Sequence, residues 1–164
     1  DSLSTLSFDY PRRADFFSRE LEELFVLAYE NNLDIMSLKG SYAGAMGFGQ
    51  FIASSYRAYA VDFDGDGKAD LFNSIDDAIG SIGNYLYIHG WKRDGGIIKE
   101  VNLNDIRRPI FTNENLTKYV ILNFTEDNQE KYFIGDDNFI AITKYNISHF
   151  YAMAVYYLSK EFKL

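Results

Sequence analysis

The sequence predicts an α+β fold that is mainly helical and carries a small antiparallel β-sheet lobe. Apolar residues recur with helical spacing in the first half of the chain and again near its end. Between them lie short runs of β-branched and aromatic residues, separated by turn residues. Helices, then strands, then one further helix are typical of this class. We therefore expect a helical part at residues 1–95, a β-sheet lobe at 96–145 and a helix at 146–164 that returns to the helical part.

The composition narrows the class of protein. The chain has 164 residues, with 24 acidic and 16 basic side chains and a formal charge of −8. Such a chain lacks the clustered Lys and Arg that neutralise phosphates, so we expect no nucleic-acid partner. Cysteine is absent, which excludes disulfides, thiolate catalysis and zinc–cysteine sites. Aromatic residues make up 17% of the chain, and composition favours their packing in the core; the alternative is that some tyrosines line a groove and stack on sugar rings.

Helical spacing first appears after Pro11. Four apolar residues share one face: Leu21, Leu24, Phe25 and Ala28. The acidic residues beside them are expected on the solvated face: Glu20, Glu22 and Glu23. A glycine-rich loop at 39–50 and a short helix at 54–59 are predicted next. The loop does not fit a nucleotide site, because no strand precedes it and no Gly-Lys-Ser/Thr follows, so we expect no organic cofactor.

A third helix is expected after Ser74, because residues 74–77 fit a variant of the capping box. Its apolar face carries Ile79, Ile82 and Leu86, and Gly90 ends it. The runs predicted as strands are Ile97–Leu103, Tyr119–Phe124, Tyr132–Ile134 and Phe139–Tyr145. The last helix is expected to begin after Ser148 as its N-cap.

Alternating aspartates mark the turn before the third helix. Asp62, Asp64 and Asp66 occupy the first, third and fifth positions of an EF-hand-like calcium loop, and Gly67 occupies the sixth. A hard cation requires several oxygen ligands, and alternating carboxylates can point at one centre. The alternative is a solvated acidic turn.

The remaining positions of the loop match the calcium pattern less closely. Lys68, at the seventh position, would offer its backbone carbonyl. The twelfth position is Asn73 rather than the bidentate Glu, so we expect Asp76 or Asp77 to supply the last carboxylate. The ligand set suits a structural Ca²⁺, with Na⁺ or an empty loop as alternatives.

Five motifs in order give the chain a resemblance to a known family. They are TLSFDYPRRA at 5–14, KGSYAGAMGFGQF at 39–51, YAVDFDGDG at 59–67, AIGSI to HGW at 78–91, and ITKYN to YAMAV at 142–155. With these motifs the chain resembles the membrane-bound lytic murein transglycosylase B family. The resemblance covers nearly the whole chain and is weakest at about residues 97–135.

The resemblance implies a lysozyme-like fold with a calcium loop and an enzyme that cuts peptidoglycan glycan strands. The bond between N-acetylmuramic acid and N-acetylglucosamine is cleaved without water. One Glu protonates the glycosidic oxygen and then takes the proton of the muramic C6 hydroxyl, which closes a 1,6-anhydro ring. The resemblance also implies a location in the periplasm of a Gram-negative bacterium. Some members of the family carry an outer-membrane anchor, which here would precede Asp1. We expect a monomer.

The resemblance also assigns residues to sites. Positions that bind substrate in the family match Ser41, Gln50, Tyr85, Tyr145, Asn146 and Tyr151. Among these, Ser41 corresponds to a hydroxyl near the catalytic Glu and Gln50 to an amide that contacts the sugar. The family's metal positions match Asp62, Asp64, Asp66 and the Lys68 carbonyl, and alignment back from Ala78 favours Asp77 over Asp76 as the last ligand.

One departure from the family concerns the catalytic Glu. Its Glu-Thr/Ser-x-aromatic-Gly motif precedes the segment found here at Leu6–Ala14, so it would lie upstream of Asp1. We therefore expect no catalytic residue within this chain and no activity of this chain alone. The alternatives are a non-catalytic peptidoglycan-binding module, or an interaction protein built around the calcium loop. A Glu-x-x-aromatic-Gly stretch just before Asp1 would favour the enzyme over the module.

Overall fold

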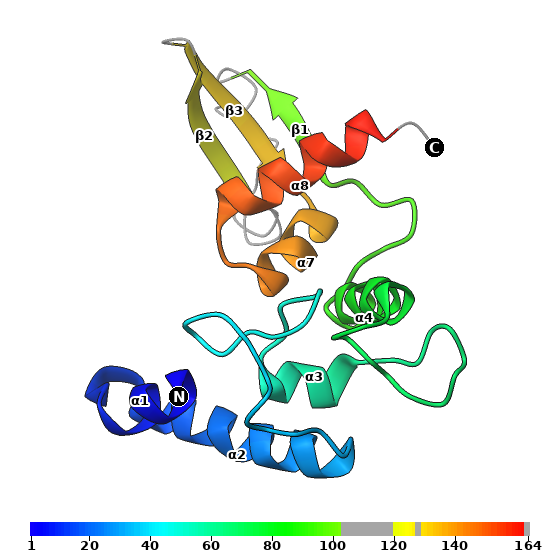
Figure 1. Cartoon of the computed structure of the whole chain (residues 1–164). Coiled ribbons are helices and arrows are strands. Elements are labelled where there is room, and N and C mark those ends of the chain that lie inside the picture. The colour runs from blue at the N-terminus through cyan, green and yellow to red at the C-terminus, as the bar shows by residue number, and fades with distance from the viewer. Residues whose placement is uncertain (103–119, 127–128, 163–164) are drawn as a thin grey trace. The chain divides into compact units, whose positions relative to one another are not determined.

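The computed structural model describes residues 1–102, 120–126 and 129–162. The chain divides into two compact units, Asp1–Tyr85 and Leu86–Leu164. Figure 1 shows helices and loops in the first unit, and a small sheet with further helices in the second. None of the described helices is long and apolar enough to cross a membrane.

Helices form the scaffold of the first unit. The first elements are α1 (Ser2–Phe8), the 3-10 helix η1 (Pro11–Arg13) and α2 (Ala14–Glu30). A long loop leads to α3 (Ala53–Tyr59) and then to α4 (Ile75–Ile88), whose last residues belong to the second unit. The helices predicted after Pro11, at 54–59 and after Ser74 correspond to α2, α3 and α4, although Ile79, predicted on the apolar face of α4, is 60% exposed. Apolar spacing misses α1, in which the buried residues are Leu3 and Ser7.

Both ends of α4 are set by its own sequence. The N–H of Asp77 donates to the Ser74 hydroxyl at 3.1 Å, which confirms the predicted cap. At the other end Gly90 has a φ of 96°, a left-handed conformation that glycine adopts without strain. Its N–H donates to the Tyr87 carbonyl at 3.1 Å, so the helix stops there.

The buried face of α2 differs from the predicted one. Phe17 and Leu27 are buried, whereas Phe25 is 58% exposed. Glu20, expected in solvent, is only 5% exposed, so that expectation is wrong. Its carboxylate accepts the backbone N–H and the hydroxyl of Ser54 at 3.1 and 2.6 Å. Glu20 thereby satisfies the first turn of α3, where unpaired N–H groups favour a negative charge.

A second group of contacts joins the same two helices nearer the solvent. Arg57 of α3 pairs with Glu23 and Glu30 of α2. Two guanidinium nitrogens reach the Glu30 carboxylate, each at 2.8 Å. Solvent screens these exposed charges, so they fix the angle between the helices more than they stabilise the fold.

The second unit contains a three-stranded antiparallel sheet. Its strands are β1 (Ile98–Val101), β2 (Val120–Glu126) and β3 (Gln129–Gly135), in the order β1-β3-β2. The register places Ile98 and Val120 opposite Gly135. This confirms the predicted small antiparallel sheet. The outer ends of two predicted strands, at residues 103 and 119, lie outside the described residues.

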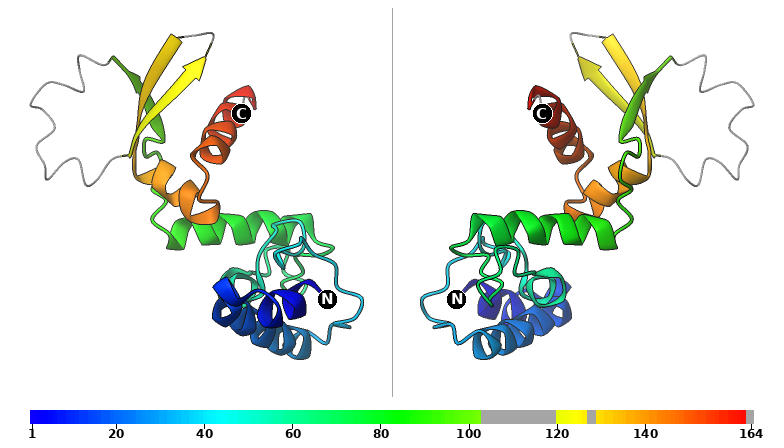
Figure 2. Two further views of the ribbon diagram at one scale, coloured as in Figure 1. Left: turned by 90° about the vertical axis from the view of Figure 1, so that its left-hand side faces the viewer. Right: turned by 90° about the vertical axis from the view of Figure 1, so that its right-hand side faces the viewer.

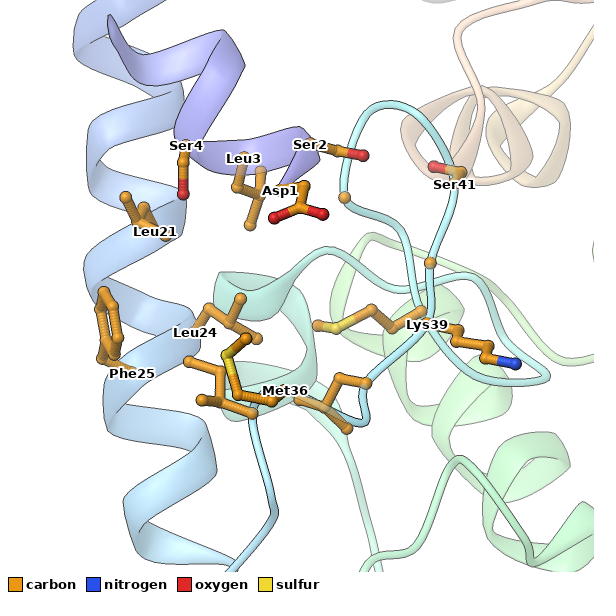
Figure 3. Close-up of a pocket in the computed structure, with 15 residues that line it drawn as sticks. Asp1, Ser2, Leu3, Ser4, Leu21, Leu24, Phe25, Met36, Lys39 and Ser41 are labelled. Atoms are coloured by element: carbon orange, nitrogen blue, oxygen red, sulfur yellow. The ribbon is translucent and has the colours of Figure 1, made fainter.

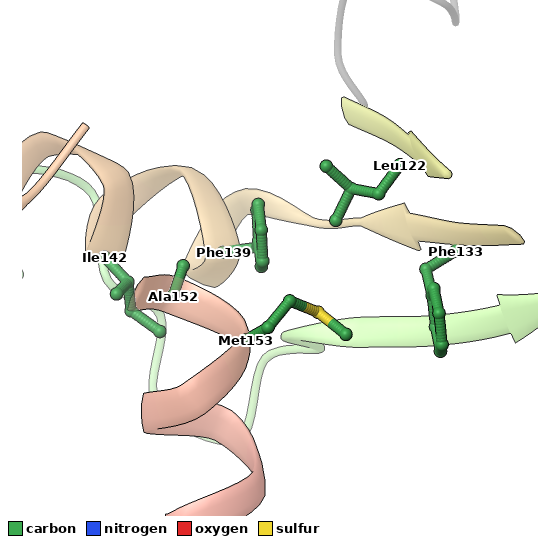
Figure 4. Close-up of a cluster of buried hydrophobic side chains, with 6 residues drawn as sticks. All are labelled: Leu122, Phe133, Phe139, Ile142, Ala152 and Met153. Carbon is green, nitrogen blue, oxygen red and sulfur yellow. The ribbon is translucent and has the colours of Figure 1, made fainter. Parts of the chain in front are cut away.

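Two helices, α7 (Asp137–Tyr145) and α8 (His149–Glu161), follow the sheet in the chain. Figure 2 shows α8 beside one face of the sheet, with α7 near the end of β3. The core between them, drawn in Figure 4, consists of Leu122, Phe133, Phe139, Ile142, Ala152 and Met153. The predicted cap of α8 is confirmed, because the Ser148 hydroxyl accepts the N–H of Tyr151 at 3.3 Å.

The strand predicted at Phe139–Tyr145 is wrong, since this segment is α7. The Asp136 carboxylate accepts the N–H of Asp137 at 2.7 Å and caps the helix. Phe139 and Ile142 are both buried in one core, which helical spacing allows and strand alternation would prevent. The β-branched residues of the segment therefore follow tertiary packing rather than their strand preference.

The first prediction concerns Glu20, which joins α2 to α3. Glu20→Gln should lower the free energy of unfolding by about 1–3 kcal/mol, because one acceptor of the Ser54 pair becomes an amide in a buried position. Chemical denaturation measures this. Glu22→Gln, an exposed change on the same helix, should stay within about 0.5 kcal/mol of the parent. Equal effects of the two substitutions would contradict this role of Glu20.

Candidate functional site

The acidic loop between α3 and α4 gathers three carboxylates. Asp62, Asp64 and Asp77 each offer one oxygen, and these oxygens lie within 4.8 Å of one another. Asp66 is not in this group, and its carboxylate accepts the N–H of Lys68 at 2.9 Å. The loop thus brings together three of the five residues predicted to bind a metal.

Asp77 closes the loop onto the start of α4. Its side chain is fully buried. One carboxylate oxygen accepts the N–H groups of Phe63 and Asp64 at 2.7 and 3.3 Å, and the other accepts that of Asp70 at 2.8 Å. The hydrogen bond from Phe63, followed by that from Asp70, holds the pKa of Asp77 below its usual range. Asp76, the alternative ligand, is exposed and lies outside the group of carboxylates.

The donor set fits a hard cation such as Ca²⁺. Three carboxylates converge, and carboxylate oxygens are the ligands that Ca²⁺ prefers. The loop holds its shape through its own hydrogen bonds: the two oxygens of Asp62 accept the N–H groups of Gly65 and Gly67 at 2.6 and 2.8 Å. Ser74 donates to the second oxygen of Asp64 at 2.9 Å. A cation would relieve the repulsion among the carboxylates.

The glycine-rich loop presents Ser41 and Gln50. Met46 forms antiparallel bridges with Gly40 and with Phe51, so the loop folds back on itself twice. The Ser41 hydroxyl oxygen accepts the N–H groups of Ala43 and Ala45 at 3.3 and 3.1 Å. These contacts occupy its lone pairs, so the group it offers to a ligand is its O–H donor.

Gln50 has an unusual backbone for its residue type. Its φ is 48°, in the left-handed region that residues with a Cβ rarely adopt. The side chain is exposed, and its amide nitrogen donates to the Gly47 carbonyl at 3.0 Å. Backbone conformations of this kind cluster at functional sites, and they also occur in exposed turns such as that of Asn32.

A pocket of about 310 Å³ lies beside Ser41 within the first unit. Figure 3 shows Ser2 and Leu3 of α1, and Leu21 of α2, around it, with Lys39 and Ser41 on the loop. Its lining is mixed: apolar side chains from α1, α2 and the loop alternate with the polar side chains of Asp1, Ser2, Ser4, Lys39 and Ser41. Of the substrate-binding residues that the sequence predicts, Ser41 alone lines this pocket within the part of the chain that the structure describes.

Tyr85, the third predicted substrate residue of the first unit, lies in an aromatic cluster on α4. Its ring meets that of Tyr59 edge-on at 4.9 Å between centroids and that of Phe51 at 5.8 Å. Burial, with a smaller contribution from the Tyr59 hydroxyl, raises the pKa of Tyr85. The half-buried ring is therefore held in one orientation, with its hydroxyl neutral at physiological pH.

The other predicted substrate residues meet in the second unit, at the turn from α7 to α8. The rings of Tyr145 and Tyr151 stack at 6.4 Å between centroids and 18° between planes. Asn146 lies between them in the chain, and its side-chain oxygen accepts the N–H of Ser148 at 3.0 Å. The turn thus presents two parallel aromatic faces and an exposed amide.

Tyr56 supports the site, although no sequence motif marks it. It is buried in α3, donates its hydroxyl to the Ala69 carbonyl at 2.7 Å and accepts the N–H of Leu71 at 3.0 Å. Burial raises its pKa. The Leu71 carbonyl in turn accepts the N–H of Phe48 at 2.9 Å. No local pattern signals these links, because their partners are far apart in sequence.

The chain has helices, a glycine-rich loop, an acidic loop and a small antiparallel sheet. Solved lytic transglycosylases share this arrangement, which is a lysozyme-like fold. Residues 1–160 match the family model described as "Transglycosylase SLT domain", and the chain belongs to that family. Membrane-bound lytic murein transglycosylase B of Escherichia coli K12 is 41% identical over an alignment of 186 positions, which covers 100% of this chain and 50% of that protein.

Two solved structures share the fold at a similar level. Soluble lytic transglycosylase SltB1 from Pseudomonas aeruginosa is 42% identical with a TM-score of 0.87, over 98% of this chain and 61% of that chain. Escherichia coli Slt35, solved in complex with calcium, is 40% identical with a TM-score of 0.87, over 98% of this chain and 57% of that chain. The chain spans about half the length of the curated relative that it matches.

The second prediction concerns the acidic loop at varied pH, with a chelator present. Because the pKa of Asp77 is lower in the fold than in the unfolded chain, its charge stabilises the fold above the unfolded pKa. This contribution is lost as pH falls through the folded pKa. Asp77→Asn should therefore be less stable than the parent at neutral pH, and the difference should shrink below about pH 4.

Urea denaturation at a series of pH values measures this difference. Asp76→Asn, an exposed change one residue away, is the matched control and should change stability little. A difference between Asp77→Asn and the parent that stays constant with pH would contradict the assignment.

Proposed function

We propose that this chain forms the C-terminal part of the catalytic domain of a lytic murein transglycosylase. The enzyme would cleave the bond between N-acetylmuramic acid and N-acetylglucosamine in peptidoglycan and leave a 1,6-anhydromuramic end. The observation that carries this proposal is the glycine-rich loop, which presents the Ser41 hydroxyl beside a pocket and the exposed amide of Gln50 on a left-handed backbone. The similarity to murein transglycosylase B supports the same conclusion.

The residues have separate roles in the proposed reaction. Ser41, whose lone pairs are already occupied, would donate its O–H to a carboxylate or a sugar oxygen at the pocket. Gln50 would orient a sugar through its amide. Tyr85 in the first unit, and Tyr145 and Tyr151 in the second, would stack on sugar rings.

The proton donor of the reaction is, in this proposal, a Glu outside residues 1–164. Among the described residues that line the pocket, Asp1 is the only acid. Glu20 is buried and holds the first turn of α3, so it cannot reach a substrate without breaking that contact. A single carboxyl group serves as acid and then as base, since the muramic C6 hydroxyl replaces water as the nucleophile.

A structural Ca²⁺ would be held by Asp62, Asp64 and Asp77, with Asp66 and the Lys68 carbonyl as further ligands. The convergence of the first three and the calcium complex of Slt35 support this. We also propose that the protein acts as a monomer on glycan strands in the periplasm of a Gram-negative bacterium. The membrane-bound relative from Escherichia coli supports that location.

The third prediction tests the reaction by mass spectrometry of muropeptides. Purified peptidoglycan is incubated with residues 1–164 and, in parallel, with the complete gene product. Release of 1,6-anhydro-muropeptides by the complete product alone is the expected result. If residues 1–164 also release these products when incubated by themselves, the proposed proton donor is wrong. If both proteins bind the glycan and neither cleaves it, the protein is a binding module.

The fourth prediction separates binding from backbone strain at Gln50. In the complete product, Gln50→Gly should reduce kcat/KM about tenfold, the effect of losing one hydrogen bond of about 1.4 kcal/mol. Its stability should not fall, because glycine adopts a φ of 48° without strain. Asn32→Gly, at a φ of 50° in an exposed turn, is the matched control and should keep full activity. Unchanged activity in both variants would contradict the role of Gln50.

A further inference from the structure

One face of α4 contacts the segment that leads into the acidic loop. Asp77, Gly80, Ser81 and Asn84 share this face, at helical spacings of three, four and seven residues. The segment before and within the loop, residues 59–64, is fastened along it. Neither Ser81 nor Asn84 belongs to the group of carboxylates.

Two hydrogen bonds fasten the segment before the loop. The N–H of Val61 donates to the Ser81 hydroxyl at 2.9 Å, and Ser81 is fully buried. One turn further along α4, the Asn84 amide donates to the Tyr59 carbonyl at 2.9 Å. The backbone therefore runs antiparallel to the helix, in one fixed register.

Gly80 continues this contact into the loop itself. Its missing side chain leaves room for Phe63, and a Cβ at this position would lie 2.6 Å from Cβ and Cγ of Phe63. Phe63 stands between two of the converging aspartates and donates its N–H to Asp77 at 2.7 Å. Gly83, on the same helix, meets nothing within 4 Å, so a methyl group there would be harmless.

We propose that Gly80, Ser81 and Asn84 are positioning residues for the metal loop. They hold residues 59–64 in the one register that brings Asp62 and Asp64 to Asp77, although none of the three is itself a ligand. This inference rests on the proposed calcium site. It attributes part of the calcium affinity of the loop to the face of α4 that carries these three residues.

The expected effect on affinity follows from preorganisation. When the segment is already fixed without metal, binding need not order it, and that saving appears in the dissociation constant. Removing the Ser81 hydroxyl leaves the Val61 N–H without its partner and frees the segment. Calcium must then order the segment on binding, so the affinity falls.

The test is isothermal titration of the metal-free chain with CaCl₂. Relative to the parent, Ser81→Ala and Gly80→Ala should each raise Kd about tenfold, which corresponds to about 1.4 kcal/mol. Asn84→Ala, at the far end of the segment, should raise it less. Gly83→Ala is the matched control, because it adds the same methyl group to the same helix and should leave Kd unchanged.

Thermal unfolding with EGTA and with CaCl₂ gives a second measurement, the rise in Tm that calcium causes. A substitution that only destabilises the fold would not reduce this rise. Calcium should raise the Tm of the parent and of Gly83→Ala by equal amounts, and that of Ser81→Ala by less. Variants that lose stability but keep the parental Kd would overturn the proposal and leave the calcium site intact. A parent that binds no calcium would overturn both.

Discussion

The first unit depends on one buried carboxylate, that of Asp77. It accepts three backbone N–H groups, from Phe63 and Asp64 on one side of the acidic loop and from Asp70 on the other. A loop of mostly exposed residues has little apolar surface to bury, so hydrogen bonds must fix its path. Because Asp77 itself lies in the capped first turn of α4, the position of that helix determines the position of the loop.

The effect of this contact extends to the glycine-rich loop. Fixing Asp70 also fixes Leu71, which is fully buried and held a second time by the Tyr56 hydroxyl. The Leu71 carbonyl accepts the N–H of Phe48 and lies against Gly47, where any Cβ would collide with it. Gly47 has a φ of 68°, so glycine is required there both for space and for conformation. The position of Gln50, three residues on, therefore depends on the far side of the acidic loop.

The sequence predicted those features whose partners are close along the chain. Ser74 caps Asp77, only three residues away, and Asp62 and Asp64 alternate along one loop. Both features can be recognised from their spacing alone. The buried position of Glu20 cannot be recognised in this way, because its partner, Ser54, is 34 residues away and a glutamate beside other glutamates on a helix is normally solvated. The β-branched neighbours of Phe139 favour a strand, whereas the core formed with α8 determines a helix.

In the proposed function, an acidic chain binds peptidoglycan, which is itself acidic. Because direct charge attraction is not available, the proposed binding would depend on aromatic faces and neutral hydrogen bonds. Tyr145 and Tyr151 in the second unit and Tyr85 in the first would offer such faces, and Gln50 would offer an amide. In the proposed site three of the carboxylates converge on one cation, so calcium would offset part of the −8 charge as well as hold the loop. Removing calcium should then weaken glycan binding through both effects at once, most strongly at low ionic strength where charge repulsion is least screened.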